Sequence, residues 1–116
     1  MKDDEFKLIL HIKNLCFLVM DITKIFPNKE KALKDNFISE CFKLLENTYS
    51  ANIINLNDNR RRLVQEKILV NIYMIDFYLS VSYHYGFISS SNFKKVTNLL
   101  SEVSKTAKGW MKYGKS

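Results

Sequence analysis

Apolar side chains recur every three or four residues along most of the chain, which is the spacing that places them on one face of an α-helix. The first such segment runs from about Asp4 to Phe26 and stops before Pro27, which can open a helix but cannot continue one. Further segments run from about Asn28 to Ile54, from about Asn59 to Tyr85 and from about Ser90 to Met111. The pattern predicts four helices and no strands.

Short links of turn-forming residues separate these segments. The stretch "NLNDNR" precedes the third segment, and Gly86 with a run of serines precedes the fourth, where a serine can cap the helix. Because the links are short, consecutive helices should pack antiparallel, as in an up-down-up-down four-helix bundle. With 116 residues, three glycines and one proline, residues 1–116 are expected to form a single all-α domain.

The third segment is apolar on two sides. At about 100° per residue, one stripe of side chains can face the bundle core, and a second stripe points almost the opposite way. An apolar surface of this size usually marks an interface. We therefore expect self-association or a tight protein partner, with a predicted oligomer interface of Val70, Met74, Phe77 and Val81. The alternative is that neighbouring helices of the bundle cover both stripes.

Positive charge is concentrated in the second half of the chain. The net charge is +6, and residues 59–116 hold ten Lys and Arg against three Asp and Glu, whereas residues 1–58 hold eight against nine. Such asymmetry is typical of proteins that bind nucleic acid. The alternative is a solvated face that keeps the protein soluble. The candidate nucleic-acid-binding residues are Arg60, Arg61, Arg62, Lys94, Lys105, Lys108 and Lys112.

No catalytic, metal or cofactor site is predicted. The ending "GWMKYGKS" matches the phosphate-binding pattern G-x-x-x-x-G-K-S, but that loop must follow a strand and begin a helix, and here a helical segment precedes it. His11 and His84 stand alone. Cys16 and Cys41 lie in apolar helical stretches and are expected to be reduced core residues, with a disulfide or metal role as the alternative. The protein is therefore expected not to be an enzyme.

The N-terminal stretch "MKDDEF" is acidic and does not resemble a secretory signal. The most apolar stretch lies in the third segment and is interrupted by Asn71, Asp76 and His84, so a membrane-spanning helix is not expected. A cytoplasmic location is predicted.

Four short motifs resemble a known family. They are "FPNKE" at the first turn, "YSANI" late in the second segment, "YGFIS" between the third and fourth, and "KGWMKYGKS" at the C-terminus. In this order they are similar to the four-helix-bundle family that includes the accessory variability determinant (Avd) of diversity-generating retroelements and the proteins encoded by intervening sequences in 23S rRNA genes. The Gly-Trp-Met-Lys segment is closer to the Avd branch, and "SANI" is closer to the intervening-sequence branch.

The resemblance implies a homopentameric barrel of bundles with a basic surface. In the retroelement branch, that barrel binds the reverse transcriptase and the RNA or DNA template. The expected function is thus that of a non-enzymatic accessory protein with these partners. The alternative is an oligomeric protein-interaction module of the intervening-sequence type, which has no role in nucleic-acid binding.

Overall fold

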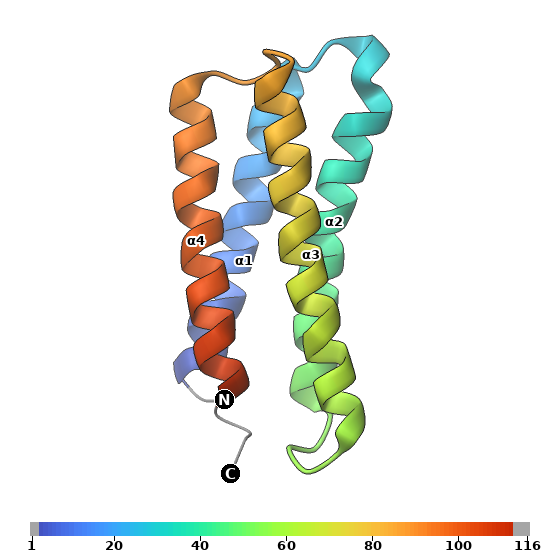
Figure 1. Cartoon of the computed structure of the whole chain (residues 1–116), viewed down its shortest axis with the longest axis vertical. Helices are drawn as coiled ribbons and strands as arrows, with labels where there is room; N and C mark the ends of the chain where they lie inside the picture. Colours follow the sequence, from blue (N-terminus) through green and yellow to red (C-terminus); the bar gives the residue numbers. More distant parts are fainter. Residues whose placement is uncertain (1–2, 113–116) are drawn as a thin grey trace.

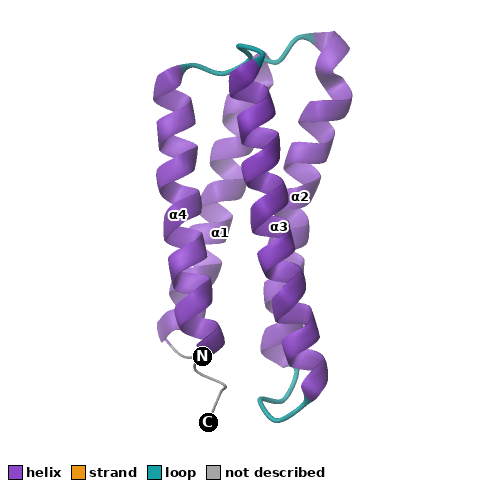
Figure 2. Ribbon diagram, in the orientation of Figure 1, coloured by secondary structure: helices purple, strands orange, loops and turns teal. Residues whose placement is uncertain are grey.

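The computed structural model describes residues 3–112, and over this range the chain forms four long helices and no strand (Figures 1 and 2). The helices are α1 (Asp3–Ile22), α2 (Lys31–Ile53), α3 (Asn59–His84) and α4 (Ser90–Lys112). Two 3₁₀ turns, Thr23–Ile25 and Asn28–Glu30, flank Pro27 between α1 and α2. Consecutive helices run antiparallel, as the sequence predicts (Figure 1).

The end of α1 is the largest departure from the predicted boundaries. The α-helix ends at Ile22 rather than at Phe26, and one 3₁₀ turn follows. The buried Thr23 hydroxyl donates to the Val19 carbonyl at 2.7 Å and reaches the Met20 carbonyl at 3.3 Å. A side chain that bonds the preceding turn in this way competes with the regular backbone pattern, which fits a helix that tightens here.

Capping residues define the starts of α3 and α4. The Asp58 carboxylate accepts a hydrogen bond of 2.9 Å from the Arg60 backbone N–H, and the Ser89 hydroxyl accepts one of 3.1 Å from that of Asn92. Both pairs satisfy donors that a helix start leaves without partners. Gly86 adopts a φ of +75°, a left-handed conformation that glycine tolerates best, and so closes the turn between the two helices. The predicted serine cap and glycine turn are both confirmed.

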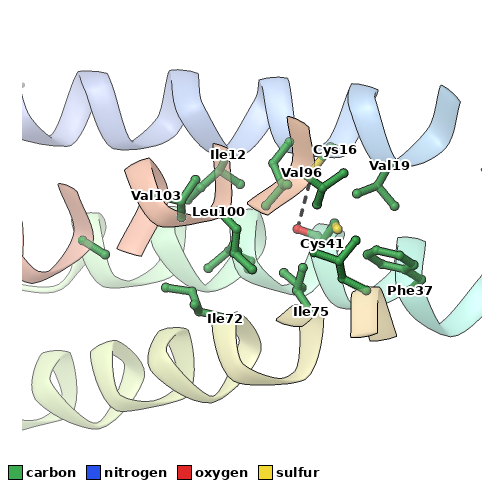
Figure 3. Close-up of a cluster of buried hydrophobic side chains, with 14 of the residues drawn as sticks. Ile12, Cys16, Val19, Phe37, Cys41, Ile72, Ile75, Val96, Leu100 and Val103 are labelled. Atoms are coloured by element: carbon green, nitrogen blue, oxygen red, sulfur yellow. Dashed lines mark hydrogen bonds between the residues drawn. The ribbon is translucent and has the colours of Figure 1, made fainter. Parts of the chain in front are cut away.

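All four helices contribute to one buried core (Figure 3). Within this core α1 packs against α2 and α4, and α3 packs against α2 and α4. Its largest fully buried side chains are Trp110, Phe37, Leu8, Ile12, Leu15, Leu44, Ile68, Ile75 and Leu79. The predicted core stripe of the third helix therefore does face inward.

One polar network crosses the interface between α2 and α3. The side-chain amide of Asn71 donates to the buried Glu40 carboxylate at 2.8 Å, and the amide of Asn47 donates to the Asn71 oxygen at 2.7 Å. Buried polar groups are tolerated where they have such partners. The network explains why an asparagine interrupts the apolar run of α3.

Candidate nucleic-acid interface

The solvent face of α4 carries a row of lysines. Val96, Leu100, Val103, Ala107 and Trp110 are buried on one side of this helix. At 100° per residue, four exposed lysines fall on the opposite side, and they are Lys94, Lys105, Lys108 and Lys112. The amphipathic pattern of α4 thus positions the predicted basic row as the sequence suggests.

These four lysines have no acidic partner within the described range, because the ion pairs found among residues 3–112 involve other side chains. Lysines that are exposed and unpaired keep their ammonium groups available for an anionic ligand. Along a helix rising about 1.5 Å per residue, the row from Lys94 to Lys112 is about 27 Å long.

The predicted arginine run separates into different environments. The Arg60 guanidinium forms a 2.6 Å ion pair with Asp58, and its side-chain hydrogen bonds hold the pKa of Asp58 below the usual value. Arg62 is exposed and lies 3.8 Å from Glu66, one helical turn further on. Both arginines are accessible, but each has a carboxylate beside it that reduces its net positive charge.

Arg61 does not belong to the exposed arginine surface that the sequence predicts, because its side chain is only 6% exposed. Its guanidinium donates to the Ile54 carbonyl at 3.1 Å, lies 3.6 Å from the Glu5 carboxylate and sits 5.3 Å from the centre of the Trp110 ring. The Trp110 indole N–H donates to the same Glu5 oxygen at 3.2 Å. We call Glu5, Arg61 and Trp110 the end cluster, and it is a structural junction between α1, α3 and α4.

A groove of about 480 Å³ lies between α3 and α4. Its α3 wall includes Tyr73 and Asp76, and its α4 wall includes Lys105 and Lys108 with the small polar side chains of Ser101 and Ser104. Tyr73 is 69% exposed. The groove was not predicted, since it depends on the distance between the two helices. It brings an aromatic ring next to two of the four lysines.

The second apolar stripe of α3 points to solvent in the single chain. Leu63, Val70 and Phe77 are 60%, 58% and 57% exposed, while Met74 and Val81 are half-buried. The expectation that no bundle neighbour fully covers this stripe agrees with these exposures. Its role as an oligomer interface stays a prediction.

Exposed apolar side chains on α1 and α2 were not predicted from the sequence, and we refer to them together as the α1–α2 surface. Phe6 and Phe17 of α1 are 61% and 65% exposed, and Phe42 of α2 is 47% exposed. Leu10 and Tyr49 are also exposed on these helices. A helical wheel of α1 alone places Phe6, Leu10 and Phe17 on one side, away from the buried Ile12 and Leu15. That spacing is the signal that could have revealed the surface.

The two cysteines, which were considered for a disulfide or metal role, lie in the buried core. Cys16 and Cys41 are free and buried, and the Cys16 thiol donates to the Cys41 carbonyl at 3.6 Å (Figure 3). Burial raises the pKa of Cys16 to about 11 and moves that of Cys41 in the same direction. Over the described range, no group of three or more His, Cys, Asp or Glu side chains is arranged to hold a metal ion.

The terminal G-x-x-x-x-G-K-S pattern lies only partly in the described range. Gly109 is inside α4, which continues to Lys112, so the first glycine of the pattern belongs to a helix and not to a loop after a strand. Gly114, Lys115 and Ser116 lie outside the described residues. Among residues 3–112, no helix combines the length and the hydropathy needed to cross a membrane.

Comparison with known proteins adds no family assignment. No protein-family model matches the chain, and no curated protein is similar enough to count as a relative.

Proposed function

We propose that this protein is a non-enzymatic, oligomeric accessory protein that binds nucleic acid through the lysine row of α4. By its resemblance to the Avd branch, its partners would be a reverse transcriptase and the RNA or DNA template of a diversity-generating retroelement. The observation that carries the proposal is the row of four exposed lysines without acidic partners among the described residues. Lysines at helical spacing reach phosphates more readily than base edges, so binding should depend little on sequence.

Self-association fits the positions of the exposed apolar side chains. The α3 stripe and the α1–α2 surface are different surfaces, on different helices of one chain. When two different surfaces of a subunit meet, the contact is head-to-tail and can close into a ring, whereas a two-fold dimer uses one surface twice. The resemblance implies five subunits. A ring would repeat the lysine row in each subunit and strengthen a weak contact through avidity.

The direct test reverses two charges in the row. Lys105→Glu together with Lys108→Glu should weaken binding to a labelled RNA, measured by fluorescence anisotropy at about 50 and about 200 mM salt. Each neutralised phosphate releases condensed counterions, so removing two contacts should reduce the salt dependence by about two in the log–log slope. Circular dichroism and sedimentation should show unchanged helicity and oligomer size.

A matched control changes the net charge by the same amount elsewhere. Lys13 of α1 and Lys29 of the turn between α1 and α2 are exposed and take part in none of the ion pairs found among residues 3–112. Lys13→Glu with Lys29→Glu changes the net charge by the same amount away from the lysine row, and it should leave RNA binding nearly unchanged. If the wild-type protein does not bind RNA or DNA at low salt, or if both double variants bind equally, the basic-row proposal is wrong.

The second candidate is an oligomeric module that binds only proteins. The exposed apolar residues of two surfaces favour it, because such surfaces usually bind another protein. Under this alternative, the lysine row would serve solubility, and the purified oligomer would not retain RNA at any salt concentration.

A further inference from the structure

The groove between α3 and α4 has opposite chemistry on its two walls. Lys105 and Lys108 lie on the α4 wall, whereas Asp76 and the ring of Tyr73 lie on the α3 wall. A phosphate backbone is attracted to the lysines and repelled by the carboxylate. Any nucleic acid in this groove would therefore run its backbone along α4, with its bases directed toward α3.

Exposed aromatic rings continue beyond this groove toward the α3–α4 turn. A neighbouring surface hollow of about 680 Å³ is lined by Phe77, Val81, Tyr83, His84, Tyr85 and Phe93. Phe77 and Val81 belong to the predicted oligomer interface, so assembly through that stripe would leave only the Tyr83–Phe93 end of the hollow open. Tyr83 stacks on Phe93 with ring centres 4.3 Å apart, and Tyr85 is 67% exposed. Accessible aromatic rings therefore lie both beside the two lysines of the groove and further along α3, toward the turn.

The spacing along the helices suits a short single strand. Tyr73 and Tyr85 are separated by about 18 Å, and Lys94 and Lys108 by about 21 Å, at a rise of about 1.5 Å per residue. An unstacked strand is more extended than a strand of a duplex, so a few nucleotides cover this length. Lysines that follow the backbone beside rings that stack on bases are the combination by which proteins bind single-stranded nucleic acids.

We propose that the α3–α4 groove binds single-stranded RNA or DNA in preference to a duplex, with a base stacked on Tyr73 and phosphates held by Lys105 and Lys108. In a duplex the bases are already stacked on one another, so they cannot reach the Tyr73 ring. This inference rests on the proposed nucleic-acid-binding function and specifies its ligand.

The test compares a labelled RNA of about 12 nucleotides, within the site sizes that such proteins bind, with the duplex of the same sequence at low salt. Wild-type protein should bind the single strand at least about tenfold more tightly than the duplex. Tyr73→Ala should weaken single-strand binding about tenfold, which is the loss expected for one base–aromatic contact, and should leave duplex binding unchanged. Tyr73→Phe keeps the ring and should retain the wild-type affinity.

Two controls separate this inference from the proposed function. Ile25→Ala removes an exposed apolar side chain of the 3₁₀ turn after α1, which lines neither the groove nor the hollow and lies outside both apolar surfaces, and it should not change binding. Equal affinity for single strand and duplex, both lost in the Lys105/Lys108 charge-reversal variant, would overturn the single-strand inference and keep the nucleic-acid function. An unchanged affinity in Tyr73→Ala would also overturn it. An acidic peptide of about the same length that binds as tightly as the RNA would overturn the nucleic-acid ligand itself.

Discussion

Replacing Trp110 with alanine should destabilise the bundle by about 4–6 kcal/mol, because this side chain closes the core where α1, α3 and α4 meet. Trp110 is only 1% exposed, and removing a buried tryptophan side chain costs about 3–5 kcal/mol. The ring also lies 5.3 Å from the Arg61 guanidinium, a cation–π contact worth about 1 kcal/mol. A domain of this length has about 6–17 kcal/mol of stability in total, so the loss should be large but measurable.

Urea unfolding followed by circular dichroism measures this loss, because Trp110 is the only tryptophan and its fluorescence disappears in the variant. With a slope of about 1.5 kcal/mol per molar urea, the midpoint should fall by about 3 M. Trp110→Phe keeps an aromatic ring but loses the N–H that bonds Glu5. That variant should lose only about 1–3 kcal/mol, because the acceptor is left without this partner.

Tyr73→Ala provides the matched control, since it removes an aromatic side chain that is 69% exposed. Its stability should change by no more than about 0.5 kcal/mol. The reasoning would be refuted if Trp110→Ala cost less than about 1 kcal/mol. A red-shifted, freely quenched Trp110 emission in the native protein would refute it as well, because a buried indole emits at shorter wavelength and is protected from quenchers.

Three further predictions concern glycines, cysteines and assembly. Gly86→Ala should lower the free energy of unfolding by about 1 kcal/mol, because Gly86 has a positive φ. Gly109→Ala should raise it by about 0.5–1 kcal/mol, because Gly109 is helical and an added methyl meets no atom within 4 Å. Thermal unfolding measures both changes, and effects of the same sign would contradict this. Burial raises the pKa of Cys16 from 9.0 to about 11 and also raises that of Cys41. Because the unfolded chain loses these protons at lower pH than the folded protein, the free energy of unfolding should fall as pH rises from about 9 to 11. Cys16→Ala should make that fall less steep. Phe77→Glu should weaken self-association about 100-fold, as measured by sedimentation equilibrium. The exposed part of the ring has an area of about 110 Å², and burying it at about 25 cal/mol per Å² contributes about 3 kcal/mol. An unchanged association constant would exclude the α3 stripe as the interface.

Periodicity predicted the four helices and the buried side of α4, because spacing along one helix determines which residues share a face. The apolar stripe Val96, Leu100, Val103 is an example, and its residues are all buried. The same spacing placed Lys105 and Lys108 on the opposite, exposed side. These outcomes depend only on residues that are near one another in the sequence.

Three features that were not predicted depend on residues far apart in the sequence. Arg61 is buried against Glu5, near the start of α1, and Trp110, near the end of α4. Glu5 and Trp110 are 105 residues apart in the sequence. Asn71 has a buried partner in Glu40, which lies 31 residues earlier. The groove beside Tyr73 depends on how closely α3 approaches α4. A pattern read along one segment contains none of this information.

The packing of α1 against α4 has a consequence for the nascent chain. The apolar side of α1 is complete when Ile22 has been added, but α4 starts only at Ser90. At about 5–20 residues per second, the ribosome needs about 3–14 s to make the residues between them. During that interval α1 can pair with α2 but lacks α4, the helix that covers its remaining side. The half-built bundle is therefore the state in which this chain is most open to aggregation or to a chaperone, and the end cluster of Glu5, Arg61 and Trp110 can form only when that interval is over.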